Sequence, residues 1–156
     1  MSTATTTPTN HALEETLAKL ETALLSPVVS GELKGWFTTV REAASTFALD
    51  WTRYLNTVLH AEYKQIVQTD PELSSSVEKM IRNDQTLLDK LAKFHEDLHT
   101  LEQRAEQLEW QENKLAAERQ RLEETGIALI VQIKKQRATA ETWVAESYYR
   151  DRGVKD

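Results

Sequence analysis

Residues 101–129 read LEQRAEQLEWQENKLAAERQRLEETGIAL, and a leucine stands at every seventh position of this stretch. The same register continues upstream through Met80, Leu87 and Phe94. An apolar residue every seven positions forms a stripe along a helix that packs against another helix. The stretch therefore predicts a long heptad or coiled-coil seam. The leucines expected to make its contacts are Leu101, Leu108, Leu115, Leu122 and Leu129.

A companion register runs beside this one and is mostly apolar, as at Val77, Leu91 and Leu98. It also contains charged residues. Polar residues at seam positions can determine how helices align and which partners they accept. We therefore expect the following charged positions to set the register of the seam: Asp84, Glu112 and Arg119.

The seam admits two geometries, because no Gly or Pro occurs between Glu72 and Gly126. In one geometry, Glu72 to about Tyr148 forms a single helix on the order of 110 Å long, which would need a second chain to cover it. In the other, the chain turns within His95–Arg104 and folds back on itself. We favour the turn, because helices this long are uncommon outside coiled coils.

Two further helices are predicted upstream. The first spans about residues 10–26, and the second spans about residues 32–68 before Asp70, an expected N-cap, and Pro71. The core stripe of the second is Trp36, Val40, Ala44, Phe47, Trp51, Leu55, Val58 and Ile66. The sequence thus predicts an all-α antiparallel bundle of three to four helices, with one domain at 10–149, a disordered N-terminal tail at 1–9 and a C-terminal tail at 150–156.

The composition argues against nucleic-acid binding and against a membrane span. The 156 residues carry a net charge of −6 and no Cys, and an acidic chain disfavours binding to nucleic acid. The longest apolar run, residues 126–133, is far shorter than the roughly 20 residues of a membrane span. The N-terminal residues MSTATTTPT lack the features of a secretory signal, so we expect a cytoplasmic protein.

The stretch FHEDLH at residues 94–99 contains H-E-x-x-H and resembles the zinc proteases. The resemblance implies zinc ligands at His95 and His99, a general base at Glu96 and a third ligand at Glu118. Phe94 and Leu98 occupy the seam, however, which places His95 on its flank and turns Glu96 and His99 to solvent. We therefore expect surface histidines and no catalytic residue.

A second resemblance, by spacing alone, is to the hemerythrin-like four-helix bundles, which bind iron through His and Glu. It covers His11, His60, Asp84 and the run RQRLEE at residues 119–124. Lys64 stands where the pattern has Glu, and Asp84 and Arg119 stand where it has His, so only His11, His60 and Glu123 remain as ligands. His60 also lies about 180° from the core stripe of its helix. We expect no metal and no cofactor, and a zinc- or iron-binding bundle is the alternative.

The C-terminal segment contains Trp143, Val144, Tyr148 and Tyr149. These side chains either pack on Trp36 and Trp51 within the bundle or form a docking surface. The function that we predict is that of a non-enzymatic helical bundle acting through protein–protein contact, by self-association or with a helical partner. Beside the seam leucines, Trp143 and Tyr148 are its expected contact residues.

Overall fold

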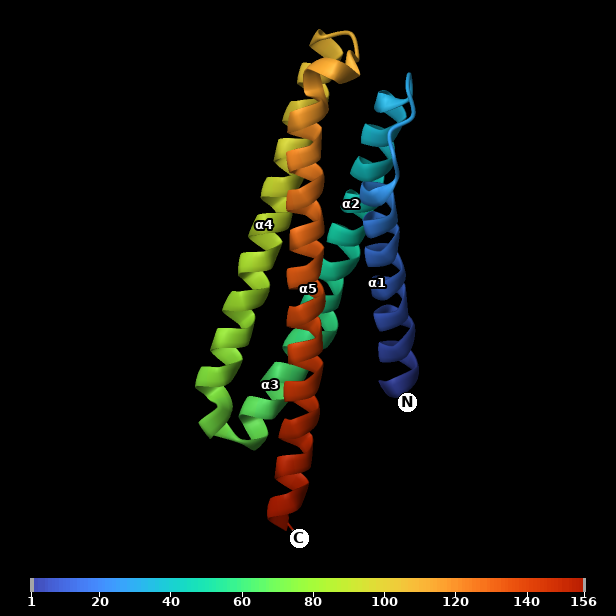
Figure 1. The fold of residues 1–156 in the computed structure, drawn as a ribbon. Helices are drawn as coiled ribbons and strands as arrows, with labels where there is room; N and C mark the ends of the chain where they lie inside the picture. The colour runs from blue at the N-terminus through green and yellow to red at the C-terminus, as the bar shows by residue number, and fades with distance from the viewer. Residues whose placement is uncertain (1, 156) are drawn as a thin grey trace.

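The computed structural model describes the backbone of residues 2–155 and the side chains of residues 10–149. Within residues 2–155 the chain forms four helical rods and no strand, and successive rods run in opposite directions (Figure 1). The predicted all-α antiparallel bundle is confirmed, whereas coiled-coil supercoiling stays a prediction. The elements are α1 (Ser2–Leu25), α2 (Leu33–Tyr54), a π-helical turn η1 (Leu55–Leu59), α3 (His60–Thr69), a 3₁₀ turn η2 (Pro71–Leu73), α4 (Ser74–Gln107) and α5 (Glu112–Lys155).

The turn between α4 and α5 lies at residues 108–111. The predicted fold-back of the chain is confirmed, but its predicted position within His95–Arg104 and the alternative of one long helix are wrong. Glu109 and Trp110 adopt left-handed backbone, with φ of 55° and 58°. The Trp110 amide donates to the Ala105 carbonyl at 2.8 Å, which caps α4 without glycine. The Trp110 ring also packs 6.2 Å from Phe37. The packing of Trp110 on Phe37 therefore stabilises the reversal despite its unfavourable backbone conformation. The turn contains no Gly or Pro.

The heptad register is divided between two facing helices by this turn. On α4 its members are Met80, Leu87, Phe94 and Leu101, and on α5 they are Leu115, Leu122 and Leu129. All seven side chains are buried in one core, and Leu108, within the turn, is half-buried. The predicted contact leucines thus lie inside the chain's own bundle. A partner would reach them only if α4 and α5 separated.

The first rod is longer than its predicted span. Its leucine stripe is buried as expected at Leu13, Leu17, Leu20 and Leu24. Helical backbone begins at Ser2 and, at the other end of the chain, reaches Lys155. The predicted disorder of residues 1–9, the C-terminal tail at 150–156 and the domain bounds at 10–149 stay predictions.

The second rod contains a change of phase at η1. A π-turn adds about one residue to a helical turn, so it rotates the residues after it by about 100°. Leu59 and Tyr63 are consequently buried, whereas Val58, predicted in the core stripe, is only half-buried. The expected N-cap at Asp70 is confirmed, because its carboxylate accepts from the Glu72 amide at 3.3 Å.

Candidate functional site

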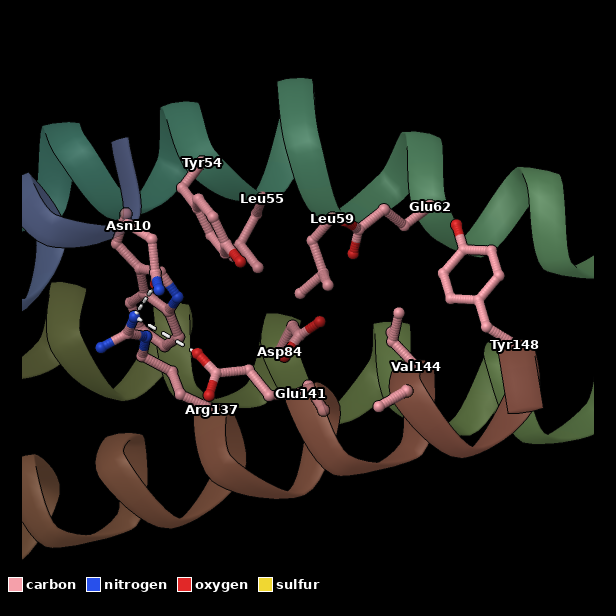
Figure 2. Close-up of a pocket in the computed structure, with 13 residues that line it drawn as sticks. Asn10, Tyr54, Leu55, Leu59, Glu62, Asp84, Arg137, Glu141, Val144 and Tyr148 are labelled. Atoms are coloured by element: carbon pink, nitrogen blue, oxygen red, sulfur yellow. Dashed lines mark hydrogen bonds and ion pairs between the residues drawn. The ribbon is translucent and has the colours of Figure 1, made fainter. Parts of the chain in front are cut away.

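A cavity of about 360 Å³ lies where η1 and its flanking helices face α4 and α5 (Figure 2). It opens to solvent beside Ala145, Glu141 and Tyr148, the last of which is 40% exposed. Its apolar wall consists of Trp51, Leu55, Leu59, Ala140 and Val144. An apolar pocket between helices with a few polar groups is the usual form of a small-molecule site in a bundle.

The π-turn shapes one wall of this cavity. Its first and last residues, Leu55 and Leu59, both line the cavity and extend their side chains into it (Figure 2). Widened turns of this kind occur often at functional sites, because they redirect side chains that a regular helix would place elsewhere. In this chain the redirected side chains are those that enclose the cavity.

Tyr54 directs a hydroxyl into the cavity from a largely buried side chain. Its side chain is 7% exposed, and Figure 2 shows the hydroxyl directed into the open space. The hydroxyl has no hydrogen-bond partner among the described residues. Burial, and then the nearby Glu62 carboxylate, raise the pKa of Tyr54, so the phenol stays neutral and can donate or accept. A hydroxyl that opens into a cavity can hydrogen-bond a ligand's polar group there.

Carboxyl groups outnumber cations in the lining. Glu62 is half-buried and has no hydrogen bond or ion pair with any described residue. Burial and then the Glu141 carboxylate raise the pKa of Glu62. The Arg137 guanidinium donates to the Asn10 side chain and lies 3.9 Å from Glu141. The cation of the lining is therefore already engaged, while Glu62 is not.

Asp84 is the buried carboxyl at the back of the cavity, with 3% of its surface exposed. It accepts from the Gln136 amide at 3.1 Å and from the Tyr63 hydroxyl at 3.4 Å. Burial raises the pKa of Asp84, and the two hydrogen bonds and His60 oppose that rise. Asp84 thus joins α3, α4 and α5 at one level of the bundle.

The other charged seam positions also contact neighbouring elements. Glu112 accepts from the backbone amide of Gly31 at 2.8 Å, and Gly31 has a φ of 85° in the α1–α2 loop. Arg119 donates to Glu123 at 3.0 Å and lies 5.6 Å from the centre of the Trp36 ring. The contacts with Gly31 and Trp36 fix α5 against the α1–α2 loop and α2, whereas the Arg119–Glu123 pair lies within α5.

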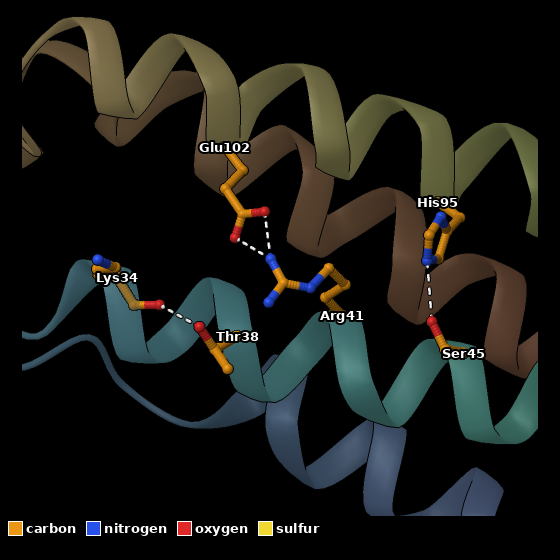
Figure 3. A network of polar contacts seen from close by, with 6 residues as sticks. All are labelled: Lys34, Thr38, Arg41, Ser45, His95 and Glu102. Atoms are coloured by element: carbon orange, nitrogen blue, oxygen red, sulfur yellow. Dashed lines mark hydrogen bonds and ion pairs between the residues drawn. The ribbon is translucent and has the colours of Figure 1, made fainter.

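The FHEDLH stretch has the phase that the heptads predict. Phe94 and Leu98 are each 1% exposed, while Glu96 and His99 are exposed. His95 is half-buried on the flank, where its Nε2 lies 3.0 Å from the Ser45 hydroxyl of α2 (Figure 3). Beside this contact Arg41 of α2 forms an ion pair with Glu102 of α4. These polar contacts link α2 to α4.

The candidate metal ligands of the two resemblances are not brought together. Glu118, the third zinc candidate, forms an ion pair with Arg104 at 2.7 Å. His11 is exposed on α1, Glu123 is paired with Arg119, and His60 is half-buried with its ring 6.3 Å from that of Tyr63. Among the residues whose side chains are described, no group of three or more His, Asp or Glu could hold a metal ion. The metal-binding alternative therefore has no ligand set in this part of the chain.

The C-terminal aromatic residues divide between packing and exposure. The Trp143 ring makes an edge contact with Tyr63 at 6.1 Å, not with the expected Trp36 or Trp51. Tyr148 lies at the mouth of the cavity, and Tyr149 is 74% exposed. Trp143 therefore packs within the bundle, on a different ring from those expected, and the docking surface stays a prediction.

No family model, curated protein or solved structure matches the chain. None of the described helices is both long enough and apolar enough to cross a membrane. Of the polar and charged residues around the cavity, the sequence singled out Asp84 as a charged residue in an apolar register and Tyr148 as an expected contact residue. It did not single out Glu62, Arg137 or Glu141, because none of them belongs to a recognisable spacing.

Proposed function

We propose that this chain is a non-enzymatic helical bundle that acts by binding, and that the cavity beside Tyr54 is its binding site. The observation that carries the proposal is Tyr54, whose side chain is 7% exposed and whose hydroxyl is directed into the cavity and unpaired among the described residues. The position of the π-turn supports it, because Leu55 and Leu59 enclose the same space.

The lining chemistry favours binding over covalent catalysis. None of the cavity's lining residues is Ser, Thr, Lys or His, so the lining offers no nucleophile of the serine, threonine or lysine type and no histidine base. The Ser45–His95 pair lies on the exposed surface between α2 and α4. The carboxyl groups and the tyrosine hydroxyl of the cavity are suited to orient a bound molecule.

Fragment screening by two-dimensional amide NMR tests this function. Small apolar fragments should shift the amides of η1 and of residues 137–148, and the variant Ala145→Trp, which blocks the exposed mouth, should remove the shifts. A screen in which no fragment shifts these amides, or in which Ala145→Trp binds as well as the parent chain, would contradict the proposal.

A second candidate is protein–protein contact, by self-association or with a helical partner. The observation that favours it is the end of α5, which runs past the α3–α4 turn (Figure 1) and carries Tyr149 at 74% exposure. Exposed aromatic side chains are enriched in interfaces. Unlike contact through the buried seam leucines, contact here leaves the bundle closed. A cytoplasmic location likewise stays a prediction.

Sedimentation equilibrium of the full chain tests this candidate. A self-associating chain should show a mass above 17.9 kDa that falls for Tyr149→Ser. The matched control is Thr142→Ser, at an exposed position on the same helix. A monomeric mass at high concentration would exclude self-association and leave only a different partner.

A further inference from the structure

We propose that the cavity binds a small organic ammonium ion with an apolar body, of the arylalkylamine class. The inference rests on the proposed binding function and names the chemistry of its ligand. Three features of the cavity carry it: the excess of carboxyl groups, the apolar wall and the Tyr54 hydroxyl.

The first feature selects a cation. Glu62, Asp84 and Glu141 line the cavity with a single guanidinium, that of Arg137. Arg137 is held by Asn10 and Glu141, whereas Glu62 has no cation beside it among the described residues. An ammonium ion near Glu62 and Glu141 would offset the repulsion between the two carboxylates. An anionic ligand would meet that same pair with only an engaged guanidinium to balance it.

The second feature selects an apolar body of limited size. Leu55, Leu59 and Val144 surround the middle of the cavity in Figure 2, and burying an aromatic or alkyl group against them is favourable. A dry cavity of about 150 Å³ is enough to hold benzene. The 360 Å³ here therefore has room for one aromatic ring and a short chain.

The third feature orients the nitrogen. An ammonium group has three N–H donors and no acceptor, so it needs several acceptors around it. The Tyr54 hydroxyl oxygen and the Glu62 carboxylate both face the cavity and are both without a partner in the described residues. A bare metal ion is less well matched, because among the described side chains no three or more His, Asp or Glu are grouped so that they could hold one ion.

Isothermal titration of the full chain at neutral pH tests the inference. The probes are 2-phenylethylamine, 2-phenylethanol, which has the same shape without the charge, and 3-phenylpropionate, which has the opposite charge. We expect the amine to bind at least about tenfold more tightly than the alcohol, and the carboxylate more weakly than both.

Variants test whether Glu62 and the cavity are responsible for the binding of the amine. Glu62→Gln should weaken amine binding by about tenfold and leave alcohol binding unchanged, because only the charge is removed. Glu146→Gln, at an exposed position of α5 outside the cavity, should change neither. Ala145→Trp should abolish binding of every probe. Thermal melts confirm that each variant is folded.

The outcomes separate the inference from the function on which it rests. Equal affinity for the amine and the alcohol, with loss of both in Ala145→Trp, would overturn the ammonium assignment and leave the binding cavity standing. A preference for the amine that survives Glu62→Gln would also overturn it. If none of the three probes binds, or if Ala145→Trp binds them all, both the ligand class and the site are wrong.

Discussion

Two regions of the α4–α5 interface differ in how completely side chains fill them. At Gly126 a Cβ atom would lie 2.8 Å from the Leu24 Cδ1 and 2.9 Å from the Phe94 Cε2, so α1, α4 and α5 touch there. Near Asp84 the same two long helices border a cavity of about 360 Å³. Heptad spacing is common to both regions. Spacing therefore determines which side of a helix faces inward, and residue size and polarity determine whether the interior closes.

Truncating a side chain in the filled region around Gly126, the closed region, should lower stability the most. Phe94→Ala removes a side chain that is 1% exposed, and we expect the free energy of unfolding to fall by about 3–5 kcal/mol. Urea unfolding measures the change. Leu49→Ala, at a position 60% exposed, should change stability by no more than about 0.5 kcal/mol. A loss below about 1 kcal/mol for Phe94→Ala would show that this region is loosely packed.

Adding atoms to the closed region should be the next most damaging change. Gly126→Val forces a branched side chain against Leu24 and Phe94, and we expect a loss of about 1–3 kcal/mol. Gly35→Val is the matched control, since an added Cβ at Gly35 meets no atom within 4 Å. Equal urea midpoints for the two variants would contradict the close contact at Gly126.

Removing a charge beside the cavity should raise the stability of the chain instead of lowering it. Because burial raises the pKa of Asp84 above 3.8, the native state holds its proton more tightly than the unfolded state does. Stability from this group is present below pH 3.8 and is lost as pH rises through the folded-state pKa. Asp84→Asn keeps one acceptor oxygen for the Gln136 amide and can donate from its own amide to the Tyr63 hydroxyl oxygen, so it should stabilise the chain by about 1 kcal/mol at pH 7.

The difference between Asp84→Asn and the parent chain should shrink as the pH is lowered from 7 to 4. Thermal melts across that range, at constant ionic strength, give the comparison. A variant less stable than the parent at pH 7 would mean that the hydrogen bonds from Gln136 and Tyr63 outweigh the cost of burying the carboxylate.

The smallest effect is expected outside both regions. Gly35→Ala in α2 places a methyl group in open space and limits the unfolded chain, so stability should rise by about 0.5–1 kcal/mol. A thermal melt suffices to measure it. A drop in the melting temperature would mean that Gly35 has a packing role that its open surroundings do not suggest.

The sequence predicted buried positions well wherever the helix is regular. Met80 through Leu101 and Leu115 through Leu129 are buried at the heptad positions, because side-chain direction in an α-helix follows from spacing alone. The reversal at Glu109 and Trp110 could not be located in this way, since it uses left-handed backbone at residues that are not glycine.

The cavity could not be predicted for a related reason. The π-turn at Leu55–Leu59 shifts the phase of α3, and no residue in it signals that shift. Glu62 and Glu141 lie far apart in the chain and meet only after the turn and the reversal are in place. Asp84 was visible as a charged residue in an apolar register, but its partners Tyr63 and Gln136 were not.

A crystal structure of the full chain grown with 2-phenylethylamine tests most directly whether the cavity beside Tyr54 is a ligand site. We predict that the ring of the amine lies between Leu55, Leu59 and Val144, and that its nitrogen lies within hydrogen-bond distance of the Glu62 carboxylate or the Tyr54 hydroxyl. An amine bound elsewhere, or a cavity closed by its own side chains in those crystals, would contradict it.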